Sequence, residues 1–257
     1  MEKYQLTLLL VMASLLSGQV YGRSEGGLIT GLEAEKKMTK KWTVGMEADM
    51  RTRNDFKTMD RWSVGLYADY KCLKWVKASA GYVLLDNHFS EKREDYISAA
   101  SNAKIKWRPS YWGFRHRFHA SFTLSHKFSN NIRLSLRERW QYTYRPSATP
   151  ERYKLDVAAQ TMKLDGNYVR GAKGKNQLRS RFQIEYDRKR SRFTPYVNME
   201  LYNSWQTEKI RYNAGTDVKI GRHHVLTLFY RLQDIRQADD DDVPDMHYAG
   251  VTYKFKF

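Results

Sequence analysis

The chain has 257 residues, a formal net charge of +17 and one cysteine, Cys72. A single cysteine excludes an intramolecular disulfide. A mean hydropathy of −0.73, with no run of 18 apolar residues after the N-terminal segment, excludes a helical membrane protein.

The first 22 residues, MEKYQLTLLLVMASLLSGQVYG, combine Lys3 with an apolar run from Leu6 to Leu16 and a small-residue end. That run is too short for a membrane-spanning helix and is typical of a cleaved secretory signal. We therefore expect a signal peptide at 1–22 and a mature domain at 23–257. Export argues against the nucleic-acid partner that the basic charge would otherwise suggest.

Beyond residue 22 the dominant period of the sequence is two. In WTVGMEADMR, apolar Trp42, Val44 and Met46 alternate with polar positions, and GFRHRFHASFTL and LRSRFQIEYD repeat the layout. Alternation over this length predicts strands. Eleven strands are expected, near 28–38, 41–51, 61–71, 75–85, 111–125, 131–144, 176–187, 192–203, 208–220, 223–234 and 246–257. Most have about ten residues or more, the length of a tilted membrane-crossing strand.

The connections alternate between five short, mostly basic turns and longer polar segments, which is the layout of an outer-membrane barrel. We predict an all-β fold, a single antiparallel up-and-down transmembrane β-barrel. Because single-chain bacterial barrels have even strand numbers, twelve strands are favoured, with ten as the alternative. The candidate positions of a twelfth strand are residues 23–30 and a segment within 152–170.

Aromatic residues near strand ends favour a membrane barrel over a soluble β-sandwich, because Trp and Tyr form girdles at headgroup level. The expected girdle is Trp42, Trp62, Trp75, Tyr111, Trp112, Tyr142, Tyr144, Trp205 and Tyr248. The last strand, HYAGVTYKFKF, carries Tyr253, Phe255 and Phe257 on one face. It predicts a signal for the barrel assembly machinery, and hence an outer-membrane location among lipid and lipopolysaccharide.

Several segments are similar to an uncharacterised family of Gram-negative outer-membrane barrels. They are KKWTVGMEADMRTR, DRWSVGLYADYKCLKW, SYWGFRHRF, LSLRERWQYTYRP, LRSRFQIEYD, TPYVNMELYN and the terminal YKFKF. The resemblance covers nearly all of the mature chain. It implies a fold and a location, and no catalytic or binding residues.

The polar parity of the strands predicts the lining of the lumen. Its basic wall is Arg115, Arg117, Arg133, Arg137, Arg139, Arg179 and Arg181, and its expected acidic partners are Glu33, Glu35, Glu47, Asp49 and Asp69. Two interpretations follow. The lumen is either filled and rigidified by ion pairs, as in a structural or surface protein, or a narrow channel that prefers anionic solutes.

The sequence gives weaker evidence for a catalytic site or a metal site than for a charged lumen. His119 and Ser121 share a strand face, but about 7 Å separates such neighbours, too far for a nucleophile and its base. We expect no enzyme and no cofactor. A barrel enzyme acting on outer-leaflet lipid or lipid A, and a periplasmic barrel binding an apolar ligand, are the alternatives. Five carboxylates form a candidate calcium loop: Asp239, Asp240, Asp241, Asp242 and Asp245.

One residue conflicts with the pattern. In RLSLRERWQYTYRP, from Arg133 to Pro146, Glu138 falls on the lipid-facing parity in the middle of a strand, where a charge is costly. Either Arg137 or Arg139 shields it, or a β-bulge shifts the register there.

Overall fold

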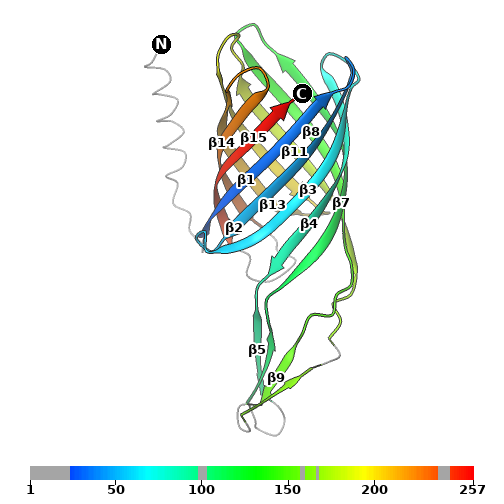
Figure 1. Cartoon of the computed structure of the whole chain (residues 1–257), viewed down its shortest axis with the longest axis vertical. Helices are drawn as coiled ribbons and strands as arrows, with labels where there is room; N and C mark the ends of the chain where they lie inside the picture. The colour runs from blue at the N-terminus through cyan, green and yellow to red at the C-terminus, as the bar shows by residue number, and fades with distance from the viewer. Residues whose placement is uncertain (1–23, 98–102, 157–159, 166–167, 237–243) are drawn as a thin grey trace.

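The computed structural model describes residues 24–97, 103–156, 160–165, 168–236 and 244–257. The expected signal peptide, 1–22, lies outside the described residues. Eleven strands close into one barrel in the order β1-β15-β14-β13-β12-β11-β8-β7-β4-β3-β2 (Figure 1). Their bounds are β1 Ser24–Lys37, β2 Trp42–Arg53, β3 Thr58–Lys71, β4 Val76–Phe89, β7 Tyr111–Lys127, β8 Ile132–Arg145, β11 Lys173–Tyr186, β12 Phe193–Asn203, β13 Thr207–Lys219, β14 His224–Ile235 and β15 Asp245–Lys256.

Four further strands form a separate sheet in the order β10-β9-β6-β5. They are β5 Lys92–Ile97, β6 Ala103–Arg108, β9 Tyr153–Asp156 and β10 Thr161–Leu164. This outer sheet extends beyond one end of the barrel, at the bottom of Figure 1. We name that end the loop end. The opposite end carries the connections 38–41, 72–75, 128–131, 187–192 and 220–223, and we name it the turn end.

The barrel fold is confirmed, whereas the predicted strand number and uniform antiparallel pairing are wrong. Residues 24–37 form one strand, and the strands within 152–170 belong to the outer sheet, so no twelfth barrel strand exists among the described residues. With an odd number, the first and last strands run in the same direction. The barrel therefore closes through a parallel β1–β15 seam that pairs Glu33 with Lys254 and Glu35 with Lys256.

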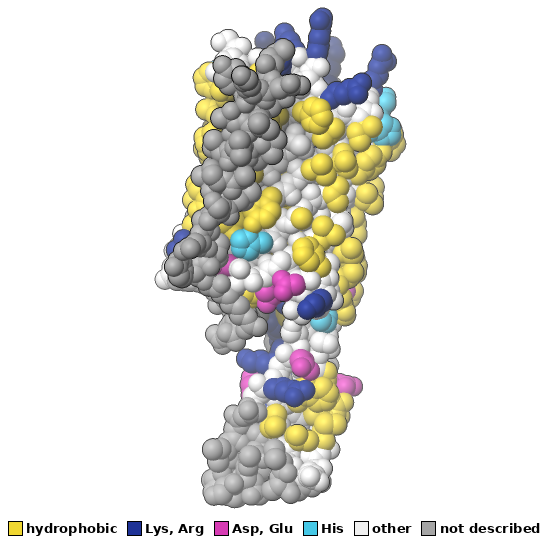
Figure 2. Space-filling model, turned by 90° about the vertical axis from the view of Figure 1, so that its left-hand side faces the viewer, with side chains coloured by type: hydrophobic (Ala, Val, Ile, Leu, Met, Phe, Trp, Pro, Cys, Tyr) yellow, Lys and Arg dark blue, Asp and Glu magenta, His cyan; other side chains and the backbone are white. Residues whose placement is uncertain are grey.

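The barrel buries polar side chains and exposes apolar ones, which is the reverse of a soluble protein. Eleven polar or charged residues of the described chain are buried, against seven hydrophobic ones. Large apolar side chains such as Leu32, Leu66 and Phe122 are more than 60% exposed on the outer wall. Figure 2 shows these hydrophobic side chains along the barrel, with Lys and Arg standing at the turn end. Among the described residues no helix is long and apolar enough to span a membrane.

Three of the seven buried hydrophobic residues lie beside the seam, where Ile29, Met246 and Tyr248 form a cluster with Phe229 packed against it. Gly250 makes this packing possible, because a Cβ at that position would overlap the Phe229 ring. Tyr248 is only 4% exposed and faces inward. Its predicted place in the outer aromatic girdle is therefore wrong.

No bulge relieves Glu138. Its pairings with Phe122 on β7 and Ser180 on β11 run without a register shift. Instead the Ser180 hydroxyl donates a hydrogen bond of 2.7 Å to the Glu138 carboxylate. A neighbouring strand thus supplies the polar partner, which alternation within one strand could not reveal.

Candidate functional site

A cavity of about 350 Å³ opens inside the loop end of the barrel, and we name it the vestibule. Nine cationic side chains and two carboxylates line it. The cations are Arg51, Arg61, Arg115, Arg117, Arg145, Lys173, Lys175, Lys209 and Arg211, and the carboxylates are Asp60 and Glu208. The strong excess of one sign makes the vestibule a region of positive potential.

The inner part of the vestibule is organised around the ring of Tyr202, which is 3% exposed. Three cations lie over this ring: Lys209 at 4.6 Å, Arg211 at 4.7 Å and Arg179 at 4.9 Å from its centroid. Arg211 also donates to the Tyr202 hydroxyl and, from Nε, to Gln233 Oε1 at 2.7 Å. Cation–π contacts hold these cationic side chains in place but do not cancel their positive charge.

Further from the loop end, the neighbouring strands β8, β11 and β12 carry a group on the lumen wall that we name the Glu200 cluster. It consists of Glu200, Arg137, Arg179, Arg181 and Tyr202. Glu200 is 2% exposed. Its carboxylate lies 2.5 Å from Arg179 Nη2, 3.3 Å from Arg137 Nη2 and 4.0 Å from Arg181 Nε. The Tyr202 hydroxyl donates to Glu200 Oε2 at 3.2 Å. One carboxylate therefore holds three arginines, and Tyr202 connects it to the vestibule.

Toward the turn end the lumen charges are matched. Lys254 lies 2.6 Å from Glu33, and Lys256 lies 3.5 Å from Glu35. The further pairs are Lys77–Asp69 at 2.9 Å, Arg133–Glu185 at 2.7 Å, Arg133–Asp187 at 2.6 Å and Lys127–Asp187 at 2.9 Å. Within the described residues, five cations meet five carboxylates here.

The predicted basic wall is thus divided over three levels. Arg115 and Arg117 line the vestibule. Arg137, Arg179 and Arg181 belong to the Glu200 cluster. Arg139, opposite Ser121 in the β7–β8 register, lies within electrostatic range of both Glu47 and Glu200. Arg133 belongs to the turn-end pairs.

The predicted pairing of this wall with the acidic residues of the first strands is largely wrong. Glu33 and Glu35 pair across the seam with Lys254 and Lys256, and Asp69 pairs with Lys77. Asp49 lies 3.5 Å from both Arg51 and Arg61. Glu47 interacts electrostatically with Arg139 and Arg179 of the wall, as predicted. The parallel seam explains the change, because it brings the lysines of the last strand beside the glutamates of the first.

The sequence prediction named only two of the nine vestibule cations, Arg115 and Arg117. Among the lumen residues that it missed are Glu200, Tyr202, Lys209 and Arg211. Each stands on the polar parity of its strand, as the alternation in VNMELYN and KIRYN shows. Parity could therefore have placed them in the lumen. It could not have given the register that sets Glu200 opposite Arg181 of β11 and within reach of Arg137 of β8.

No hydrogen bond joins Ser121 Oγ to His119, the two residues considered as a nucleophile and its base. Both are buried on the lumen face of β7. His119 Nδ1 and Ser121 Oγ each lack a hydrogen-bond partner within the described residues. His119 instead lies over Gly81, where an added Cβ would approach its ring to 2.6 Å.

The two remaining predicted sites lie apart from the lumen. Asp239, Asp240, Asp241 and Asp242 of the candidate calcium loop lie outside the described residues, and Asp245 accepts a hydrogen bond of 2.8 Å from the Ile235 amide. No group of His, Cys, Asp and Glu suited to a metal ion occurs among the described residues. In the predicted assembly signal, Tyr253 contacts His224 Nδ1 at 2.6 Å, and Phe255 packs edge-on against Phe257 at 4.6 Å.

Among solved structures, the chain is similar to domains of two autotransporters. The β-domain of the Bordetella autotransporter BrkA is 10% identical, with 82% of this chain and 79% of that chain covered and a TM-score of 0.48. The translocator domain of the autotransporter NalP from Neisseria meningitidis is also 10% identical, with 92% and 91% covered and a TM-score of 0.45. No curated protein matches the chain.

A family model described as a protein of unknown function (DUF2490) matches residues 27–243. The match spans the barrel from β1 to the connection before β15 and includes the outer sheet. It confirms the resemblance that the quoted segments indicated. The chain belongs to this DUF2490 family of proteins of unknown function.

Proposed function

We propose that the chain is an outer-membrane β-barrel protein that takes a small anionic solute into its vestibule and acts as a narrow, anion-preferring channel. The observation that carries this proposal is the charge of the vestibule, where nine cations and two carboxylates surround about 350 Å³. Toward the turn end, by contrast, the salt bridges described above join five cations to five carboxylates.

The physical reason is the cost of confining like charges. Cations withdrawn from bulk water are tolerated when opposite charges compensate them. Asp49 lies beside Arg51 and Arg61, and Glu208 beside Lys175, yet the vestibule lining keeps a net positive charge. A bound anion lowers that free energy, and the positive potential raises its local concentration at the mouth. Guanidinium groups bind phosphate, sulfate and carboxylate through paired hydrogen bonds, so these are the expected ligand classes.

The outer-membrane location is supported by the wall itself. Barrel strands of 11 to 17 residues are long enough to cross a bilayer, and a closed barrel leaves no unpaired strand edge in lipid. The exposed apolar side chains would contact lipid, with lipopolysaccharide and the assembly machinery as further partners. We place the loop end outside and the turn end in the periplasm, as in other barrels of this kind.

An anion that passes through the barrel would reach the Glu200 cluster after the vestibule. An anion moving from the vestibule could exchange its contacts with Arg211 for contacts with Arg179 and Arg137. Successive binding sites of moderate strength are what conduction requires. Glu200 would limit the rate, because its carboxylate competes for the same arginines.

The vestibule can be tested by ligand-induced stabilisation. Thermal unfolding would be followed in detergent with inorganic pyrophosphate, for the native protein and for the double variant R117Q/K209Q. Saturation near 100 times Kd should stabilise the native protein by about 2.7 kcal/mol, and the vestibule variant should lose most of this effect. As a matched control, K57Q/K163Q removes two exposed loop-end lysines and should respond like the native protein. Stabilisation of equal size in both variants would contradict the proposal.

The two alternative functions give different outcomes. A periplasmic carrier of apolar ligands would remain a monomer in buffer without detergent. An enzyme acting on lipid A would change the lipid A profile of cells that carry it, and H119A or S121A would abolish that change. Our proposal predicts neither result.

A further inference from the structure

The turn end carries a second cationic feature, which the vestibule does not explain. The segments 36–42, 71–75, 126–131, 188–193 and 219–224 contain no Asp or Glu. Each combines at least one cation with an exposed large apolar side chain: Met38 at 57%, Leu73 at 52%, Phe128 at 44%, Phe193 at 57% and Ile220 at 60%. We name these five segments the turn collar.

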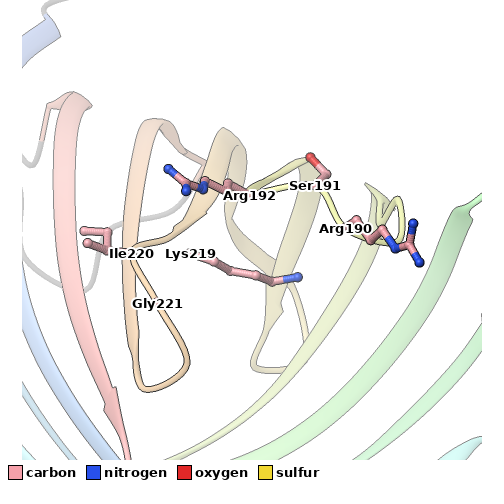
Figure 3. A pocket seen from close by; sticks show the side chains of 6 residues that line it. All are labelled: Arg190, Ser191, Arg192, Lys219, Ile220 and Gly221. Atoms are coloured by element: carbon pink, nitrogen blue, oxygen red, sulfur yellow. The ribbon is translucent and has the colours of Figure 1, made fainter.

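Within the collar, a trough of about 420 Å³ lies between the β11–β12 and β13–β14 turns. Arg190, Ser191, Arg192, Lys219, Ile220 and Gly221 line it (Figure 3). The three cations are exposed, and within the described part of the chain none of them forms a salt bridge to a carboxylate. The positive φ of Gly221, 139°, together with the open space around it, leaves the trough accessible.

We propose that the turn collar binds anionic phospholipid through its headgroup phosphates, with this trough as one headgroup site. The inference rests on the proposed membrane insertion, which would set the turn end at the inner leaflet. Cations beside exposed apolar side chains are the composition expected where a protein meets headgroups and the first acyl carbons. An acidic protein partner would use the cations but would give no reason to expose an apolar residue in every turn.

The arrangement of the cations favours a lipid surface over a free ion. In Figure 3 the guanidinium groups of Arg190 and Arg192 point in different directions, and Lys219 reaches between the two turns. The charges are therefore spread along the trough and do not converge on one point. Such spacing suits several phosphates held in a headgroup layer, with Phe193 and Ile220 beside them at the acyl boundary.

The test uses the full chain in a non-denaturing detergent, with bound lipid counted by native mass spectrometry. Titration with dioleoyl phosphatidylglycerol should give tighter and more numerous binding than dioleoyl phosphatidylcholine. The variant R190Q/R192Q/K219Q should lose this preference, by several-fold for each removed charge. The control K57Q/K92Q/K163Q removes the same charge from exposed loop-end positions and should keep it.

Three outcomes would overturn the headgroup site: equal binding of the two lipids, an equal loss in the control, or displacement of phosphatidylglycerol by millimolar inorganic phosphate. The last would indicate a simple anion site. Membrane insertion is judged separately from the need for detergent. A chain that stays monomeric without detergent refutes insertion, whereas lipid indifference in a detergent-dependent chain refutes only the collar.

Discussion

The two halves of the lumen are built from the same strands but balance charge differently. In the turn-end half, each cation of the pairs described has a carboxylate within 4 Å, as in Lys254–Glu33 and Arg133–Glu185. In the loop-end half, nine cations share a cavity with two carboxylates. The turn-end half is thus electrically balanced by its salt bridges, whereas the vestibule lining keeps an excess of positive charge that can attract an anion.

The boundary between the halves should be the most sensitive position. We expect Glu200→Gln to destabilise the protein by about 3–5 kcal/mol, because it leaves Arg137, Arg179 and Arg181 buried without their carboxylate. The measurement is the unfolding midpoint in detergent. Glu185→Gln is the matched control, since its partner Arg133 is 39% exposed in its side chain and water can replace the pair. A loss equally small in both variants would refute the central role of Glu200.

The balance of the turn-end half depends on the parallel seam. Lys254→Glu should destabilise the protein by roughly 1–3 kcal/mol, because the new carboxylate lies beside those of Glu33 and Glu35 and is repelled by both. Adding Glu33→Lys should restore most of the loss. The coupling is measured by a double-mutant cycle. A cycle without coupling would mean that β1 and β15 are not paired in this register.

The turn-end pairs also predict a small pH effect. A hydrogen bond from Lys127, with Arg133 nearby, lowers the pKa of the Asp187 carboxyl below its ordinary value of 3.8. The folded state therefore binds this proton less readily than the unfolded state does. The stabilisation is present above the ordinary pKa and is lost as the pH falls through the lowered one. We expect Asp187→Asn to cost about 0.2–1 kcal/mol at neutral pH and nothing in strong acid. A cost that persists there would contradict this cause.

Alternation in the sequence predicted the barrel, its strand positions and the inward direction of most polar residues, because side-chain direction in a strand is a local property. It failed where the outcome depends on the neighbouring strand and on its pairing register. The seam polarity, the pairing of Glu200 with β8 and β11, and the Ser180 partner of Glu138 all depend on neighbours that no single strand specifies.

The outer sheet shows the same limit. Its strands are short, four to six residues, and β6 pairs with β9 across more than forty intervening residues. In neither segment does the alternation of apolar and polar residues continue long enough to predict a strand. The register in which the two strands pair leaves no signal in the local sequence. The sequence therefore suggested long polar loops there, with a possible barrel strand within 152–170, and not a separate sheet.

The most direct test of the account is the reversal potential of the reconstituted barrel across a planar bilayer under a KCl gradient. We predict a preference for chloride in the native protein. The vestibule variant R117Q/K209Q should lose most of this preference, and the turn-end variant Lys254→Gln should change it little. A preference for potassium in the native protein would contradict the proposal, as would an equal loss of selectivity in the two variants.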